Sequence, residues 1–433
     1  MVTLVSCKDE DNGSSYNPSV PVEITKLDPE VGGSGTQCLI YGKNFGTDKS
    51  QIEVTFNGKK AVVINTKGDC IYCAVPVRAG SGPVKVKIGK EGEAQECTAE
   101  KEFKYEFVTK VGTLAGWMDK NYNSEIKDGP LEEAGFEEPY RMLIDKKTGD
   151  LIILEDKKCI RRINLKTGIV ETLFHLPQTI ERPRQISFSP TCDTLFINND
   201  QGNENGIAVA IALRSEGFRK PHPFIEAPSS TGGSCHPINK DYFFNRWHNG
   251  QFYQWDFEKG KKREFKVEAG KDSTVIHEMA NGLIANLIFA PSGKFAYIVM
   301  EDHMIYKCNY NFETRCLDNT SFIPLCGQRG DANKGYRDAF GLEARFASPQ
   351  QGCFDENDNF YLCDQENHCI RKIEPSSLVT TFAGRPMSWG FADGNLRKEA
   401  MFNRPHGIVY DSVNKIFYVA DKNNRRIRTI QEE

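Results

Sequence analysis

Residues 405–430 contain Pro405-His-Gly-Ile-Val-Tyr-Asp411, then Phe417-Tyr-Val-Ala-Asp421, then Asn424-Arg-Arg-Ile-Arg-Thr-Ile430. The same pattern starts 56 residues earlier, in Pro349-Gln-Gln-Gly-Cys-Phe-Asp355, Phe360-Tyr-Leu-Cys-Asp364 and Asn367-His-Cys-Ile-Arg-Lys-Ile373. A third copy consists of Pro139 to Asp145, Leu151 to Asp156 and Cys159-Ile-Arg-Arg-Ile163. Internal repeats of this length indicate structural units that pack on one another. Each copy predicts an inner strand after the proline, a second strand ending in an acid and a third strand with Ile-Arg-x-Ile.

A fourth, outer strand and the link after it also repeat. Outer strands are expected in Thr380–Gly384, Ile323–Gly327 and Val111–Gly116, and each link then carries an Asp, an Ala-x-Phe and the next blade-starting proline. One outer strand precedes the first copy, whereas the last copy has only three strands. We therefore predict that Val111–Ala115 completes the last sheet, which would remove open sheet edges.

The copies resemble the NHL repeat, a family of β-propeller proteins. Weaker copies are expected in the middle of the chain, starting near Pro183, Ser234 and Asn286. Residues 108–433 are therefore predicted to form a six-bladed NHL-type β-propeller, closed by residues 111–115.

Residues 22–107 predict an antiparallel sandwich, because short strand-like runs alternate with turn signals. They resemble the IPT/TIG family of immunoglobulin-like domains in Ile24-Thr25-Lys26-Leu27-Asp28-Pro29, Gly42-Lys43-Asn44-Phe45-Gly46 and Val54-Thr55-Phe56-Asn57-Gly58. The resemblance implies a spacer or an interaction module, in which Phe45 and Phe56 are core residues. The chain is thus expected to be all-β.

Residues 1–21 are interpreted as the remnant of a lipoprotein signal and a flexible tether. Leu4-Val5-Ser6-Cys7 resembles a bacterial lipobox, and Lys8-Asp9-Glu10-Asp11 resembles the surface-export signal of Bacteroidetes-type lipoproteins. The resemblance implies a lipid on Cys7, a surface-exposed place in the outer membrane and membrane association through the lipid alone. The alternative is a disordered N-terminus with a chance cysteine.

The charge of the chain argues against a nucleic-acid partner. The formal net charge is −4 at pH 7, whereas phosphate binding needs a basic face. Arg425, Arg426 and Arg428 do cluster, but they recur in the repeat and are interpreted as a solvated strand edge.

Candidate ligand-binding residues fall on one face of the predicted propeller. This face, here called the top, carries the links between blades and the turns between second and third strands. The link and turn candidates are Trp117, Tyr122, Trp247, His248, Arg329, Tyr336 and Trp389. Positions just after the blade-starting prolines are expected at the mouth of the central channel, and they are Tyr140, Arg184, Asn286, Gln350 and His406. Aromatic and polar groups around a concavity suit a glycan or a peptide.

Other recurring residues have structural interpretations. Phe136, Phe346 and Phe402 occupy one repeat position and are expected to pin the links. Asp156, Asp364 and Asp421 follow second strands, so turn hydrogen bonding explains them better than acid–base chemistry. Some NHL propellers are lyases with a metal held by several histidines, but here only His406 and His236 map near the channel mouth. We therefore expect no catalytic residue, no metal and no cofactor.

The leading hypothesis is a non-catalytic, surface-anchored binding protein that holds a polysaccharide or oligosaccharide on the propeller top. One alternative is a scaffold for another protein of the cell envelope. Another is a propeller lyase or lactonase.

Overall fold

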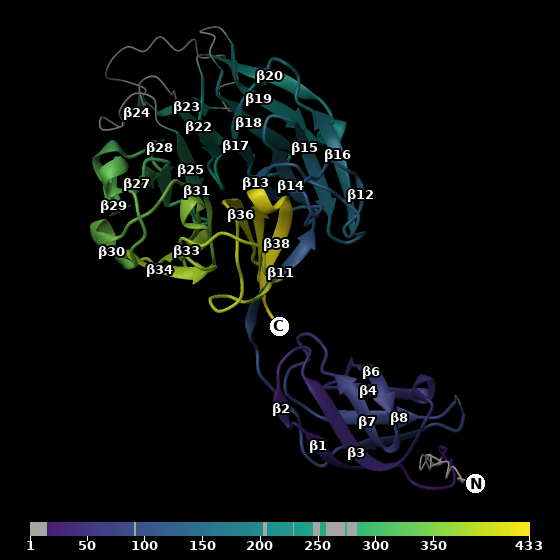
Figure 1. Cartoon of the computed structure of the whole chain (residues 1–433). Coiled ribbons are helices and arrows are strands. Elements are labelled where there is room, and N and C mark those ends of the chain that lie inside the picture. The colour runs from purple at the N-terminus through teal and green to yellow at the C-terminus, as the bar shows by residue number, and fades with distance from the viewer. Residues whose placement is uncertain are drawn as a thin grey trace, which may run out of the picture. The chain divides into compact units, whose positions relative to one another are not determined.

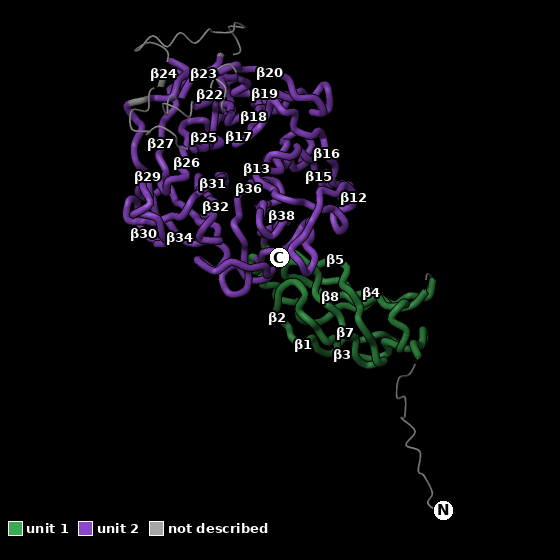
Figure 2. Tube along the Cα trace, turned by 45° about the horizontal axis from the view of Figure 1, so that its top comes forward, with its two compact units in different colours: residues 1–109, 432–433 green, residues 110–431 purple. Residues whose placement is uncertain are grey.

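The computed structural model describes residues 15–90, 92–201, 206–227, 229–245, 252–256, 273–274 and 284–433. The chain divides into two compact units, residues 1–109 with 432–433, and residues 110–431 (Figure 2). Regular structure in the described ranges consists of β-strands and three-residue 3₁₀ turns, which confirms the predicted all-β class. No helix in these ranges is long and apolar enough to cross a membrane.

The first unit is a sandwich of two four-stranded sheets. One sheet has the order β1 (Glu23–Asp28), β3 (Gln37–Gly46), β7 (Gly68–Ala74) and β6 (Val62–Thr66). The other has the order β5 (Lys59–Lys60), β4 (Ile52–Phe56), β8 (Val84–Ile88) and β9 (Gln95–Thr98). A separate parallel pair joins β2 (Val31–Gly32) and β10 (Lys104–Tyr105).

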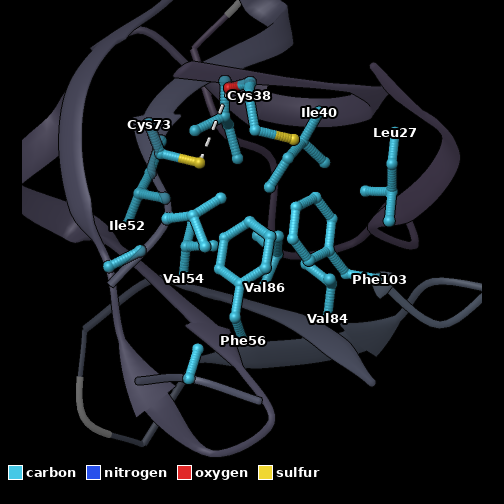
Figure 3. Close-up of a cluster of buried hydrophobic side chains, with 14 of the residues drawn as sticks. Leu27, Cys38, Ile40, Ile52, Val54, Phe56, Cys73, Val84, Val86 and Phe103 are labelled. Carbon is cyan, nitrogen blue, oxygen red and sulfur yellow. Dashed lines mark hydrogen bonds between the residues drawn. The ribbon is translucent and has the colours of Figure 1, made fainter. Parts of the chain in front are cut away.

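The alternation of buried and exposed side chains along each strand explains the core of the sandwich. In β4 the residues Ile52, Val54 and Phe56 are buried, while the residues between them are more exposed. Figure 3 shows side chains from both sheets pointing toward one another, and Phe56 meets Phe103 edge to face with ring centroids 5.0 Å apart. Phe45 and Phe56 are both buried, as the sequence predicted.

The second unit contains six sheets among the described residues, which are numbered here as blades 1 to 6 from the N-terminal side. Blade 1 has β13 (Pro139–Ile144), β14 (Leu151–Glu155), β15 (Cys159–Asn164), β16 (Ile169–His175) and β12 (Gly129–Pro130). Blade 2 has β17 (Pro183–Phe188), β18 (Thr194–Asn199), β19 (Ile207–Leu213) and β20 (Pro221–Glu226). Blade 3 has β21 (Gly233–Cys235), β22 (Asp241–Asn245), β23 (Phe252–Asp256) and β24 (Ser273–Thr274).

The remaining blades continue the ring. Blade 4 has β25 (Ala285–Phe289), β26 (Phe295–Met300), β27 (Met304–Asn311), β28 (Cys316–Leu317) and β29 (Ile323–Gly327). Blade 5 has β31 (Pro349–Phe354), β32 (Phe360–Asp364), β33 (Cys369–Ile373), β34 (Leu378–Ala383) and β30 (Ala339–Phe340). Blade 6 has β36 (Pro405–Asp411), β37 (Ile416–Asp421), β38 (Arg426–Glu432), β11 (Thr109–Ala115) and β35 (Gly394–Asn395).

The six inner strands close into a ring around a central channel. Each of β13, β17, β21, β25, β31 and β36 contacts the next, and β36 contacts β13 again (Figure 1). In blade 6, the early strand β11 lies beside the late strand β38. The sheet is therefore built from both ends of the propeller sequence.

A buried arginine explains why three blades share the Ile-Arg-x-Ile pattern. Arg371 of blade 5 is fully buried and binds Asp364 of the second strand and Asp338 of the preceding link, at 2.8 Å each. It also donates to the carbonyl groups of Arg345 and Arg337, both in the link. This arrangement is called the arginine clamp here, and it ties the link to the blade that follows it.

The same clamp recurs in blades 6 and 1. Arg428 binds Asp421 at 2.8 Å and also contacts Asp393, while Arg161 binds Asp128 at 2.9 Å. Each guanidinium lies over a buried link phenylalanine, Phe346 under Arg371, Phe402 under Arg428 and Phe136 under Arg161. The interpretation of Arg428 as a solvated residue is wrong, because its charge is satisfied inside the clamp.

The acids of the clamp also accept backbone hydrogen bonds. Asp364 accepts from the amide of Ala347 and Asp421 from that of Asn403. In blade 1 the corresponding acceptor is Glu155, not Asp156. Its Oε1 atom lies 3.5 Å from Arg161, so this pair is looser than its counterparts.

Candidate functional site

Exposed aromatic and apolar side chains gather on two links at the top of blade 6. They are Tyr122, Met387, Trp389 and Phe391, with exposed fractions of 66%, 72%, 62% and 45%, and are called the rim patch here. Both links border the turn between β37 and β38. The amide of Asn424 in that turn donates to Gly390 O at 2.7 Å, and Arg425 reaches Ser124 O at 3.5 Å.

Local backbone geometry holds these side chains outward. Tyr122 and Met387 both have a left-handed φ of 63°, a conformation in which non-glycine residues are uncommon. The Asp119 carboxylate accepts from the amides of Asn121 and Asn123, so the loop around Tyr122 is an ordered Asx turn. The guanidinium of Arg426 lies 4.1 Å from the centre of the Phe391 ring. The rim patch is therefore presented by hydrogen-bonded loops.

The other link candidates from the sequence lie elsewhere. Tyr336 is hydrogen-bonded to Thr381 and lies under the buried Arg371, so it packs in the blade 5 clamp. Arg329 donates to Asp302 at 2.7 Å, beside blade 4. Trp117 is half-buried at the start of the link that carries Tyr122.

Trp247 and His248 lie outside the residues that the structure describes. Cys7 also lies outside them. Sequence reasoning did not single out Met387 and Phe391, although Phe391 occupies the same repeat position as Tyr336 and lies, like it, beside a clamp arginine.

The predicted channel-mouth residues meet around an arginine that the sequence analysis did not single out. Arg141 donates to Nδ1 and O of His406, to Oε1 of Gln350 at 3.1 Å and to Arg184 O at 2.8 Å. The Tyr140 ring lies 3.8 Å from the His406 ring. We call Tyr140, Arg141, Gln350 and His406 the plug, because all four are buried and come from three blades.

The plug is electrostatically unusual. Burial and the neighbouring Arg141 charge hold the pKa of His406 well below its usual range. His406 is therefore neutral and accepts a hydrogen bond from Arg141 through Nδ1. Arg184 stays partly exposed above it and binds Asp200 through two nitrogens at 3.0 and 2.9 Å.

Asn286, the equivalent residue of blade 4, is also buried. Its amide oxygen and nitrogen have no hydrogen-bond partner among the described residues. Those residues also contain no group of three or more His, Cys, Asp or Glu side chains placed to hold a metal ion.

Below the plug, the channel widens into a cavity of about 240 Å³ that the sequence did not reveal. All six inner strands contribute to its wall, and we call it the lower cavity. No repeat motif predicts the lower cavity, because the residue types at its lining positions differ from blade to blade.

Comparison with known proteins supports both halves of the architecture. The IPT/TIG domain family matches residues 21–105, and the NHL repeat family matches residues 402–430. The bovine NHL repeat-containing protein 2 is 31% identical over 98 residues, which cover 22% of this chain and 13% of that protein.

Several solved structures from Bacteroides match nearly the whole chain. An auxiliary nutrient binding protein of Bacteroides thetaiotaomicron is 34% identical, with a TM-score of 0.72 and coverage of 97% of this chain and 99% of that one. An auxiliary nutrient binding protein of Bacteroides ovatus is 29% identical, with a TM-score of 0.81 and coverage of 97% and 100%. A third protein, from B. thetaiotaomicron and provisionally described as a phosphatase, is 30% identical, with a TM-score of 0.70 and coverage of 97% and 99%.

Proposed function

Because this chain belongs to the family of IPT/TIG and NHL-repeat proteins that includes the B. thetaiotaomicron auxiliary nutrient binding protein, we propose that it is a non-catalytic binding protein of the cell envelope. Its ligand is a polysaccharide or oligosaccharide, held on the propeller top. A lipid on Cys7 anchors the protein to the outer membrane, and residues 1–21 hold the signal remnant and a flexible tether. Residues 22–107 act as a spacer, and residues 108–433 carry the site.

The rim patch is the observation that carries this proposal. Trp389 and Tyr122 expose 62% and 66% of their surface on two links that border one turn. Flat aromatic faces stack on the apolar faces of sugar rings, and nearby polar groups orient the hydroxyls. Exposed polar residues flank both aromatics, including Asn121, Asn123 and Ser388. An open rim suits a chain-like ligand, whereas the channel mouth is filled by the buried plug.

Alanine variants of Trp389 and Tyr122 test the proposal. A glycan array on the purified protein identifies an oligosaccharide, and calorimetry then measures its affinity. Each variant should weaken binding by about tenfold, because one stacked aromatic contributes about 1 kcal/mol beyond its buried area. Val413→Ala is the matched control. Val413 is 86% exposed in the β36–β37 turn of the same blade, on the face opposite the links.

Two results would contradict the proposal. One is the absence of binding to any glycan on the array. The other is an equal loss of affinity in the Val413→Ala control, which would show that the rim patch is not the site.

Capture of another envelope protein is the second candidate function, because Met387 is 72% exposed within the rim patch and methionine packs well on irregular apolar surfaces. A stable partner recovered from envelope extracts with the wild type, but not with the Trp389 variant, would favour it. Hydrolysis of p-nitrophenyl phosphate by the purified protein would overturn the non-catalytic assignment and favour the activity given for the third relative.

A further inference from the structure

The lower cavity is a pocket with one closed end and one open end. Its closed end is the plug, where Arg141 and Gln350 are each 1% exposed. Toward the bottom face, the lining residues Leu143, Phe188 and Ile288 are half-buried, and Lys146 is exposed. The gradient indicates that the cavity opens at the bottom face, opposite the rim patch.

The charge of this lining has a single sign. Arg141 at the closed end and Lys146 at the open end are cationic, and the described lining includes no Asp or Glu. Within the described part of the chain, Arg141 donates only to neutral acceptors: two carbonyl oxygens, an imidazole nitrogen and an amide oxygen. Among the described residues, Arg141 is connected to a carboxylate only indirectly, through Gln350, whose amide nitrogen donates to Glu301 at 3.3 Å. A buried charge without a directly bonded counterion is costly, so an anion entering here would be stabilised.

An unpartnered hydroxyl lies in the same wall. Ser187 is 5% exposed and lines the cavity, and its Oγ atom has no hydrogen-bond partner among the described residues. Buried polar groups are nearly always satisfied, so such a group calls for a partner that is not part of the chain. The hydroxyl is free to donate to a ligand oxygen.

The rest of the wall is apolar. Ile186, Phe354 and Ile408 contribute to it from three different blades. A cavity of about 150 Å³ with apolar walls is enough to hold benzene, so the lower cavity can take a ring with a short side chain. The side-chain oxygens of Gln185 and Gln351 already accept hydrogen bonds from backbone amides. These two side chains therefore do not offer acceptors to a ligand.

From this lining we infer a second ligand site, in which the lower cavity binds a small monocarboxylate with an aromatic or branched apolar body. The carboxylate faces Arg141 and Ser187, and the apolar body lies against the six-blade wall. This site is separate from the rim patch and does not depend on glycan binding.

Calorimetry with 4-phenylbutyrate and its neutral counterpart 4-phenylbutanol tests the inference. The carboxylate should bind with 1:1 stoichiometry and about tenfold or more tighter than the alcohol, as expected when a charge-assisted bond is lost. Ser187→Ala should weaken carboxylate binding several-fold while leaving the melting temperature of the free protein unchanged or higher. Ile288→Trp, which fills the cavity, should abolish binding of both probes.

Ser230→Ala is the matched control. Ser230 is fully buried in the same propeller, but its hydroxyl is hydrogen-bonded and lies outside the cavity lining. It should lower the melting temperature and keep the carboxylate affinity. Trp389→Ala should also leave the carboxylate affinity unchanged. The proposal for the rim patch and the proposal for the lower cavity can therefore be contradicted separately.

Equal affinity for acid and alcohol would overturn the inference, as would no saturable binding of the acid at millimolar concentration. Unchanged affinity in both Ser187→Ala and Ile288→Trp would also overturn it.

Discussion

Arg371 shows how one residue can fix a link to a blade. Its guanidinium is fully buried and binds two carboxylates and two carbonyl oxygens, with Phe346 below it. A planar guanidinium can satisfy several acceptors at fixed angles, which an ammonium group cannot do. The repeat therefore preserves an arginine together with the acids it binds.

Replacing Arg371 with alanine should cost about 3–5 kcal/mol of unfolding free energy, because Asp364 would be left charged and buried without its partner. Arg371→Lys should recover only part of this loss. Chemical denaturation measures both effects. Lys372→Ala is the control. Lys372 is the next residue in the same strand, but its side chain is only half-buried and pairs with Glu374. Similar stabilities for the Arg371 and Lys372 variants would contradict the clamp.

Glu155 gives the propeller a pH dependence near neutrality. Burial raises its pKa from 4.5 to about 7, outweighing the opposing effect of Arg161. The native carboxyl therefore binds its proton more tightly than the unfolded one, and stability falls as pH rises through this window. The total effect is about 3 kcal/mol.

The Glu155→Gln variant isolates this contribution. The stability of the wild type relative to the variant should fall between pH 5 and pH 8, as measured by urea denaturation at several pH values. Glu132→Gln, at an exposed position in the preceding link, should show a constant difference. A constant difference for Glu155→Gln as well would show that Glu155 does not titrate in this range.

At the scale of the element, the outer strands of blades 4, 5 and 6 end at or next to a glycine that lets the chain turn sharply over the blade. Gly116, Gly327 and Gly384 have φ angles of +97°, +82° and +93°. A Cβ on any of them would come within about 3 Å of a carbonyl oxygen and of the clamp phenylalanine. Backbone conformation and close packing therefore both require glycine there.

Gly384→Ala should destabilise the protein by more than Gly330→Ala. Gly330 also has a positive φ, of +87°, but a Cβ there would meet nothing within 4 Å. The free energy of unfolding of the Gly330 variant should therefore fall by about 1 kcal/mol, the cost of a left-handed conformation in alanine. That of the Gly384 variant should fall further, because the clash adds to this cost. Thermal denaturation compares the two, and equal losses would rule out the packing argument.

Sequence patterns predicted the elements where a chemical constraint recurs. The inner strands of blades 1, 5 and 6 begin at Pro139, Pro349 and Pro405, as expected, because the clamp fixes their spacing. The inner strands of blades 2, 3 and 4 were predicted to start within one residue of their observed starts, and the outer strand of blade 4 was predicted at Ile323–Gly327, where β29 lies. The sequence did not reveal the outer strands of blades 2 and 3. These blades lack the Ile-Arg-x-Ile pattern, so no recurring pair of residues marks where the outer strand falls.

The candidate sites were predicted less well. Trp389 and Tyr122 were singled out in the sequence because large aromatics in links are conspicuous, and both side chains are exposed. The burial of Tyr140, Gln350 and His406 around Arg141 could not be foreseen, because it depends on how tightly the six inner strands approach one another. The lower cavity depends on the same spacing and on residues from every blade.

At the scale of the molecule, the plug separates the two faces of the propeller. The rim patch lies on the top at blade 6, whereas the lower cavity opens on the bottom face. Our two proposals therefore place an extended ligand and a small anion on opposite faces of one ring. Occupancy of one site need not block access to the other.

The pairing of β11 with β38 also sets the order of events during biosynthesis. A ribosome makes β11 before any other strand of the ring, and its partner β38 emerges only after the other blades have been made. Pairing between segments so far apart in sequence is a slow step in folding. The propeller can thus reach its native state only once nearly the whole chain has been synthesised, so premature termination yields an open ring with exposed strand edges.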